Sequence, residues 1–262
     1  DAPQVANFLT GEGMGNYSDR LADRFGVSRA DQDEFALRSH VKAAAAHADG
    51  FYDDEVLPLG GSRKEDGVRG DSTLEKMASL KPAFQKPYGT VTAANATPFT
   101  DGASAVLSMS EEKALELGLK PKAYIKAFEW VACDPFEDLL LGPAVGTAQI
   151  LKKTGLALAD MDVIEFHEAF ASQVLANVNA LDSQDFFDKK LGGMPKVGAI
   201  DFNKFNTRGG SISIGHPFGA TGARIVTTAA NRLIAEGGRY ALLAACADGG
   251  LGHACILERY NA

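Results

Sequence analysis

The sequence has few cysteines and no long apolar run. Its three cysteines are odd in number and far apart, which argues against a disulfide framework and against a Cys-x-x-Cys metal site (Cys133, Cys246 and Cys255). We therefore expect a reducing compartment and no bound metal. No stretch approaches the roughly 20 apolar residues that a membrane-spanning helix needs, so we expect no transmembrane segment.

Positive charge is also in short supply. The 34 acidic residues outnumber the 26 basic ones, for a formal net charge of -8. A net negative field repels nucleic acid and anionic membranes, so neither is an expected partner, although a polyanionic ligand can still bind where cations are placed locally. With 262 residues, 45% of them hydrophobic, the chain can form one large or two modest domains with a real core.

The first third of the sequence reads mainly as loop with two helices. Residues 1–13 are polar and without period, and residues 58–73 are rich in glycine and charge. Ser28 and Asp31 have the form of a capping box and predict a helix to about His47. A short helix is expected over residues 74–80.

From residue 89 onward, strand patterns alternate with helix patterns. This alternation predicts an α/β fold with a sheet covered by helices. The expected strands are 89–93, 103–109, 122–131, 163–166, 240–246 and 253–260, and the expected helices are 111–117, 144–153, 169–181 and 219–236.

Three segments place reactive side chains where strands end, which is where open α/β sheets bind ligands. They are His167–Phe170, Gly215–Gly222 and Cys246–Gly252. Two of them are rich in glycine, which lets a substrate approach the backbone closely. A histidine beside a cysteine supports acid–base chemistry near neutral pH, because their unperturbed pKa values are about 6.5 and 8.5.

Each segment also has a plainer interpretation. A single histidine at a strand end is more often a solvated or hydrogen-bonded side chain, and Cys246 alone is more often part of a core. The glycine-rich segment could bind phosphate, but it lacks the Lys-Ser/Thr of a P-loop. The combination favours chemistry, and we predict that His167, His216 and Cys246 converge in one pocket.

Longer motifs in the sequence resemble those of the thiolase family. Asn206-x-x-Gly-Gly-x-x-x-x-Gly-His-Pro with Gly219–Gly222 resembles its histidine motif, and Cys246 with the following glycines resembles its C-terminal cysteine motif. Gly89–Asn95 with Asp101-Gly-Ala looks like its middle signature. The resemblance runs from about Met14 to Tyr260. His167, where many thiolases have asparagine, makes the chain similar to the 3-ketoacyl-CoA thiolase subunits of fatty-acid β-oxidation complexes, the trifunctional-protein β-subunit type, as do the segments Lys81–Phe84 and Lys86–Gly89.

The resemblance implies a layered αβαβα thiolase fold. By that resemblance, residues 1–88 form a loop domain that covers coenzyme A. Residues 89–121 form the last strand and helix of the N-terminal thiolase half, and residues 122–262 form the C-terminal half. Since the sequence starts at Asp1, we expect it to begin inside a longer product whose earlier part supplies the rest of the N-terminal half.

The resemblance also implies catalytic roles in the cleavage or formation of 3-ketoacyl-CoA thioesters. A family cysteine takes the acyl group, and His216 activates that cysteine. Cys246 exchanges the proton at the α-carbon of acetyl-CoA. His167 holds a water or donates directly at an oxyanion hole, and the backbone N–H of Asp248 serves a second one.

Coenzyme A is expected as a substrate, with no permanently bound cofactor. The resemblance places five residues along the pantetheine tunnel and one arginine near the adenine end (Met14, Ala93, Thr97, Ala169 and Phe170; Arg69). The alternative for Arg69 is a solvated loop arginine.

Two features depart from the family pattern. The Cys-x-Ser nucleophile segment is absent, and neither Cys133 nor Cys255 has that context. Residue 248 is aspartate where the family usually has glycine or alanine, and a carboxylate there repels an enolate unless it turns away.

Three functions from different classes stay open at this point. The favoured one is thiolytic acyl transfer within a complete thiolase, the chain alone being inactive. A non-catalytic module for coenzyme A binding or assembly is the second, and a ketoacyl-synthase-like condensing enzyme, against which the Cys246 motif argues, is the third. The expected partners are the N-terminal thiolase half, further copies in a homodimer or tetramer, and a hydratase/dehydrogenase subunit. We expect a bacterial cytoplasm rather than a mitochondrial matrix.

Overall fold

The structure, a computed structural model, describes residues 5–60 and 65–260. The helices are α1 (Met14–Phe25), α2 (Arg29–Ala48), α3 (Leu74–Ala78), α4 (Glu111–Glu116), α5 (Gly142–Thr154), α6 (Ala171–Leu181), α7 (Gln184–Lys190), α8 (Ser211–Ile214) and α9 (Ala220–Ala235). The described 3₁₀ turns are η1 (Phe51–Asp54), η2 (Leu158–Asp160) and η3 (Asp248–Gly250), and the strands are β1 (Ala123–Ala132), β2 (Val163–Phe166), β3 (Tyr240–Ala247) and β4 (Leu251–Arg259).

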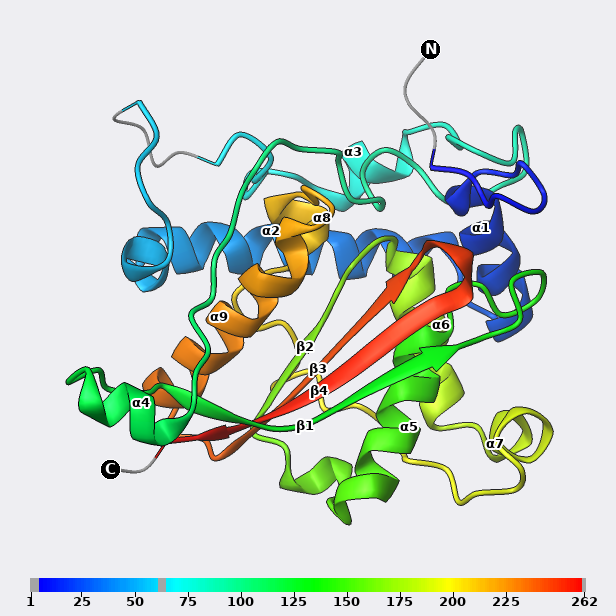
Figure 1. The fold of residues 1–262 in the computed structure, drawn as a ribbon. Helices are drawn as coiled ribbons and strands as arrows, with labels where there is room; N and C mark the ends of the chain where they lie inside the picture. Colours follow the sequence, from blue (N-terminus) through cyan, green and yellow to red (C-terminus); the bar gives the residue numbers. More distant parts are fainter. Residues whose placement is uncertain (1–4, 61–64, 261–262) are drawn as a thin grey trace.

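The four strands form one mixed sheet in the order β1-β4-β3-β2 (Figure 1). β2 runs parallel to β3, and β4 pairs antiparallel with both β3 and β1. The crossover from β2 to β3 contains α6 and α9, as parallel neighbours require. Because β2 and β3 are parallel, their carboxyl ends meet at the same edge of the sheet.

Helices cover the two faces of this sheet, and β3 shows how. Side chains alternate across a strand, so Leu242 and Ala244 join a core cluster with residues of α5 and α6, whereas Ala241 and Leu243 join a second cluster with residues of α9. All four are buried. The sheet between helical layers confirms the expected α/β class.

Helix α2 crosses the top of the sheet in the view of Figure 1, next to α8 and the edge where β2 and β3 end. Its start confirms the predicted capping box: the Ser28 hydroxyl accepts from the Asp31 N–H, and the Asp31 carboxylate accepts from the Ser28 N–H at 2.9 Å. The helix therefore begins at the residue that the sequence predicts.

Helix α5 approaches β4 through a pair of glycines. A Cβ on Gly252 would lie 2.5 Å from the Cα of Gly142, closer than any real side chain allows. The missing side chains let the helix backbone rest directly on the strand after Cys246.

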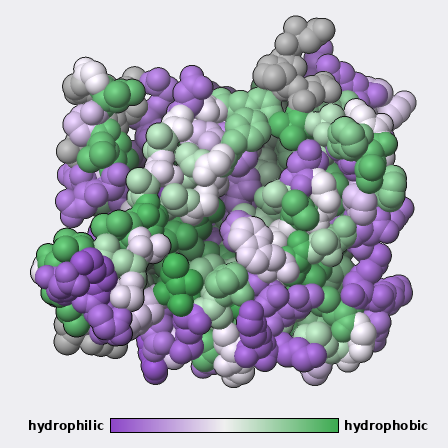
Figure 2. All heavy atoms as spheres, in the orientation of Figure 1, coloured by the Kyte–Doolittle hydropathy of each residue, from purple (hydrophilic) through white to green (hydrophobic). Residues whose placement is uncertain are grey.

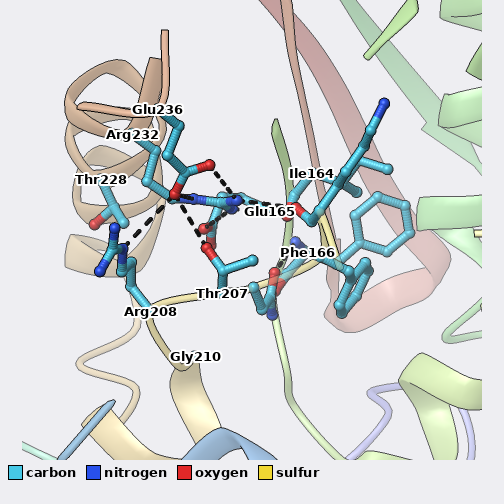
Figure 3. Close-up of polar contacts among 12 residues, drawn as sticks. Ile164, Glu165, Phe166, Thr207, Arg208, Gly210, Thr228, Arg232 and Glu236 are labelled. Carbon is cyan, nitrogen blue, oxygen red and sulfur yellow. Dashed lines mark hydrogen bonds and ion pairs between the residues drawn. The ribbon is translucent and has the colours of Figure 1, made fainter. Parts of the chain in front are cut away.

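Helix α9 is fastened to β2 by a buried ionic cluster (Figure 3). Nη1 of Arg232 donates to Glu165 at 2.7 Å, and its Nε donates to Glu236 at 3.0 Å. The side chain of Arg232 is fully buried. Since α9 begins four residues after His216, this cluster sets the position of the histidine loop relative to β2.

Two expected strands, 89–93 and 103–109, are wrong for this structure. The N–H groups of Thr90 and Val91 bond to the carboxylate of Asp19, at 2.7 and 2.9 Å, in place of a neighbouring strand. Residues 103–109 lie exposed, and no described strand pairs with them. Alternating apolar residues form a strand only where a neighbour supplies the ladder. The division of the chain at residues 88 and 121 stays a prediction.

Three helices, α1, α7 and α8, are absent from the sequence-based expectation. Helix α1 carries buried Met14, Tyr17 and Leu21 on one face, a spacing that could have revealed it. The other expected helices and strands are confirmed within a few residues. In the described part of the chain, no helix is both long and apolar enough to cross a bilayer.

Candidate active site

The first predicted motif lies where β2 ends. His167 continues the parallel ladder, because its N–H donates to Ala244 O at 2.9 Å. Its ring is buried, and its Nδ1 lies 2.8 Å from the Ser211 hydroxyl. Burial holds the pKa of His167 well below its usual value, and the positive charge of Arg224 acts in the same direction. The imidazole is therefore neutral at physiological pH.

The second motif brings a further histidine onto the first. Gly215, at φ 104°, turns the chain after α8 and puts the His216 N–H 3.2 Å from Pro98 O. Nδ1 of His216 lies 2.7 Å from the Thr221 hydroxyl, and its ring centroid is 4.2 Å from that of His167. Burial, with Arg224, lowers the pKa of His216. In the described part of the chain, its Nε2 forms no hydrogen bond and is free for a proton.

Cys246 lies on β3, two residues beyond Ala244 and opposite Gly252 of β4. Burial raises its pKa to about 12, so the side chain is a protonated thiol at neutral pH. The structure thus brings His167 and His216 into ring contact and places Cys246 at the same edge of the sheet. All three cysteines are free, and no cluster of metal-ligating side chains occurs among residues 5–60 and 65–260.

The Glu168 side chain links the segment of His167 to the segment that leads to His216. Its buried carboxylate accepts from the Asn206 amide and the Ser39 hydroxyl, both at 2.7 Å, and from the Ile212 N–H at 3.2 Å. Burial raises its pKa, and these donors oppose that shift. The carboxylate thereby joins β2, α2 and α8 at the base of the site, a role that sequence reasoning did not assign.

The residues predicted to line the pantetheine tunnel lie in two locations, one beside His167 and one in an apolar cluster with Phe84. Thr97 donates from its N–H to Ala169 O at 3.0 Å and from its hydroxyl to Ser211 O at 2.6 Å, next to His167. Phe170 packs edge-on to Phe84 with ring centroids 5.9 Å apart. Met14 belongs to the same apolar cluster as these two rings, whereas Ala93 is exposed on the loop that leads to Thr97.

Arg69 and Asp248 lie on the surface. The Arg69 N–H donates to Nδ1 of His40 at 3.2 Å, and its guanidinium bonds to carbonyls of its own loop. The carboxylate of Asp248 accepts from the N–H of Gly249 at 2.7 Å. Asp248 is therefore folded back onto its own turn.

A separate cavity of about 330 Å³ lies between α1 and the loop after β1. Arg20 and Arg24 line it, each paired with a carboxylate, and none of the predicted site residues does. This cavity is therefore separate from the predicted site residues.

Ser211 and Arg224 are the polar residues near the histidines that sequence reasoning missed. Nη2 of Arg224 donates to the Ser211 hydroxyl at 3.0 Å. Ser211 falls on an unspecified position of the histidine motif, and Arg224 looks like an ordinary helix-surface cation. No local pattern distinguishes either residue.

Comparison with known protein families supplies a match along nearly the whole chain. The model of the thiolase N-terminal domain matches residues 2–112, and that of the thiolase C-terminal domain matches residues 119–259. The chain belongs to the thiolase family. The resemblance drawn from the motifs is confirmed.

Individual relatives agree with this family. The chain is 54% identical to the mitochondrial trifunctional enzyme subunit beta of Homo sapiens, over 99% of this chain and 56% of that protein. It is 49% identical to a 3-ketoacyl-CoA thiolase of Yersinia enterocolitica, over 98% of this chain and 60% of that protein. This thiolase chain thus spans little more than half the length of the curated relatives it matches.

Solved structures give the same fold. The acetyl-CoA acetyltransferase of Bacillus anthracis superposes with a TM-score of 0.85 at 35% identity, over 98% of this chain and 62% of that one. The human mitochondrial 3-ketoacyl-CoA thiolase in complex with CoA superposes with a TM-score of 0.84 at 31% identity, over 98% of this chain and 61% of that one. The thiolase fold is confirmed.

Proposed function

We propose that this chain carries the acid–base part of a 3-ketoacyl-CoA thiolase, which cleaves its substrate to acyl-CoA and acetyl-CoA or runs the reverse condensation. The contact between the His167 and His216 rings, whose centroids lie 4.2 Å apart at the sheet edge near Cys246 on β3, is the observation that carries the proposal. The relatives named 3-ketoacyl-CoA thiolase support it. None of the three cysteines stands in a Cys-x-Ser context, so the nucleophile comes from a segment outside this chain.

His216 acts on the nucleophile in this scheme. Its pKa is lowered, so it is neutral at physiological pH and takes the thiol proton at the unoccupied Nε2 while Thr221 holds Nδ1. The resulting thiolate attacks the 3-keto carbon. The bond between C2 and C3 then breaks, and the acyl group stays on the nucleophile while acetyl-CoA leaves as its enolate.

Cys246 supplies the proton that completes this half-reaction. A thiol with a raised pKa is protonated at neutral pH and gives its proton to C2 of the enolate. A coenzyme A thiol then attacks the acyl-enzyme, which releases acyl-CoA and returns a proton to the site. His167 donates to a developing oxyanion, where one such donor is worth roughly 3–4 kcal/mol.

Coenzyme A binds, in this proposal, along the loop of Ala93 and Thr97 and beside Ala169. Phe170 and Met14 back this tunnel from the apolar cluster, and Arg69 lies toward the adenine. The contacts of Thr97 with Ala169 O and Ser211 O support the proposal, because they bring the loop against the histidine pair. The Asp248 carboxylate bonds to Gly249, which favours a backbone N–H at the second oxyanion hole over a carboxylate facing the enolate.

The partners proposed are an N-terminal thiolase half, a second copy of the enzyme, and a hydratase/dehydrogenase subunit. The relatives named trifunctional enzyme subunit beta support an assembly of this kind. Relatives occur both in mitochondria and in a bacterium, and the bacterial cytoplasm stays our prediction. Co-purification from the source cell and fractionation test both points.

A thiolysis assay of the complete protein with short and long 3-ketoacyl-CoA substrates tests the function. We expect coenzyme A-dependent cleavage, with Cys246→Ala reducing turnover by two orders of magnitude or more on the scale of a lost acid–base group. Acyl transfer from an acyl-CoA onto the nucleophile should survive better in Cys246→Ala than in His216→Ala.

Equal loss of both half-reactions in the two variants would show that the division of roles is wrong. Binding of coenzyme A without any turnover by the complete protein would support a non-catalytic binding module in place of the enzyme.

A further inference from the structure

A short relay of polar groups leads from α9 to His167. Nη2 of Arg224 donates to the Ser211 hydroxyl at 3.0 Å, and that hydroxyl lies 2.8 Å from Nδ1 of His167. Ser211 and His167 are both buried. Among residues 5–60 and 65–260 Arg224 forms no ion pair, and its Nη1 is buried without a hydrogen-bond partner. An ion pair therefore does not explain its position.

The protons of this relay can be assigned from donor and acceptor chemistry. A guanidinium only donates, so the Ser211 oxygen accepts from Arg224. The hydroxyl has one proton of its own, and in the described part of the chain His167 Nδ1 is its one remaining partner. If Nδ1 carried a proton, it would also donate to Ser211, and the buried hydroxyl proton would have no acceptor. Burying a polar group without a partner is unfavourable. The arrangement that satisfies both the Ser211 hydroxyl and the His167 ring nitrogen has Ser211 donating to an unprotonated Nδ1.

We propose that Arg224 and Ser211 set the tautomer of His167, so that Nδ1 is an acceptor and Nε2–H is the donor presented to the substrate. The use of that donor at an oxyanion rests on the proposed function. The opposite tautomer would turn an Nε2 lone pair toward the oxyanion and repel it. Arg224 is thus a positioning residue that acts through Ser211, and its charge also opposes protonation of His167, whose pKa is lowered.

Nitrogen-15 NMR of the chain labelled at its five histidines measures the tautomer directly. His167→Gln assigns the His167 signals. We expect Nε2 of His167 to have the chemical shift of a protonated nitrogen and Nδ1 that of an unprotonated one, with the Nε2–H form in excess by about tenfold or more. A protonated Nδ1, or an even mixture of the two forms, would overturn the proposal.

Two variants break the relay at different points, and two others serve as controls. Ser211→Ala and Arg224→Met should lower the excess of the Nε2–H form by about fivefold or more, because each removes the constraint on the Ser211 proton. Arg224→Lys keeps the charge and a donor and should restore much of the preference. Ser213→Ala deletes a hydroxyl on the same helix as Ser211. That hydroxyl bonds to Ser39 and Gly210, so its loss should leave the tautomer of His167 unchanged. An unaltered tautomer in both Ser211→Ala and Arg224→Met would refute the proposal.

These measurements need no turnover, so they stand apart from the proposed function. Unchanged signals of His40, His47 and His253 show that each variant folds, and Arg224→Met decides the question should Ser211→Ala fail to fold. In the complete enzyme, we expect Ser211→Ala to lower kcat by about tenfold or more with little change in KM, since the donor acts on the transition state. If the NMR shows the proposed tautomer but the complete enzyme does not catalyse thiolysis, the relay proposal stands and the proposed function is rejected.

Discussion

Gly210 lies against the carboxylate that holds the two histidine segments together. A Cβ at this position would be 2.3 Å from the carboxyl carbon of Glu168, which is itself fixed by three donors. We predict that Gly210→Ala destabilises the protein by about 1–3 kcal/mol through overpacking. Urea denaturation measures the change.

The matched control for this substitution is Gly222→Ala on α9. Apart from its chain neighbours and the backbone of its own helix, no heavy atom lies within 4 Å of a Cβ at Gly222, and this residue is helical. The same added methyl should stabilise the protein by about 0.5–1 kcal/mol. Equal effects of the two substitutions would contradict the packing argument at Gly210.

His40 on α2 gives the structure a dependence on pH that is separate from catalysis. Burial, with a smaller contribution from the charge of Arg69, lowers its pKa from 6.5 to about 4. Below pH 6.5 His40 is protonated in the unfolded chain but stays neutral in the folded one. The free energy of unfolding therefore falls as pH drops from about 6.5 to about 4. At 1.36 kcal/mol per pH unit, His40 accounts for up to about 3 kcal/mol of this loss.

His40→Leu tests this contribution. Its free energy of unfolding should fall less steeply than that of the parent protein between pH 6.5 and pH 4, as measured by urea denaturation across that range. Parallel pH profiles for the two proteins would show that the neutral His40 side chain has no such effect.

Among the helices, α9 contributes most directly to the position of the candidate site, because it follows the His216 loop and carries Arg224. Its attachment to β2 depends on the fully buried guanidinium of Arg232 between Glu165 and Glu236 (Figure 3). One oxygen of Glu165 has no hydrogen-bond partner in the described structure, and the other is held by Arg232. Removing the cation from a buried carboxylate strongly destabilises the folded state, because it leaves an unpaired charge in the interior.

We predict that Arg232→Met destabilises the protein by about 3–5 kcal/mol. The double variant with Glu165→Leu should be less destabilised than Arg232→Met alone, because no unpaired charge is left behind. Denaturation of the two single variants and the double variant gives the coupling energy. Arg239→Met, which breaks the exposed pair with Glu258, should cost less than about 1 kcal/mol.

On the scale of the whole molecule, one segment, residues 99–119, exposes many apolar side chains to solvent. Large apolar residues of 99–119 are at least partly open to solvent, with Leu107 76% and Leu117 52% exposed, and the one tryptophan, Trp130 on the edge strand β1, is 73% exposed. Figure 2 shows apolar surface (green) on the face of the molecule seen in Figure 1, with hydrophilic surface (purple) among and around it. Contiguous exposed apolar surface promotes association.

We predict that the chain self-associates as its concentration rises, which sedimentation velocity measures. Leu107→Glu with Leu117→Glu should shift the distribution toward monomer. Leu57→Glu with Leu59→Glu, placed on another exposed loop, should have a weaker effect. A sedimentation profile independent of concentration would contradict the prediction.

Most of the elements followed from the sequence because their patterns are local. The capping box of Ser28 predicts the start of α2, and apolar pairs together with the Gly237-Gly238 stop predict α9. The segment 103–109 has a strand pattern as clear as that of β1, yet it forms no strand. Pairing with a neighbouring strand is a tertiary property, and the pattern of one segment does not contain it.

The sequence by itself determined the α/β class, the thiolase motifs and the three candidate catalytic residues, because glycines, histidines and a cysteine at strand ends are readable one segment at a time. Only the tertiary structure decided that the rings of His167 and His216 touch, that Glu168 joins three elements beneath them, and that Arg224 reaches His167 through Ser211. These contacts join residues far apart in the chain. The packing of α9 and α2 around β2 creates them, and that packing depends on buried groups such as Arg232 that no local pattern distinguishes.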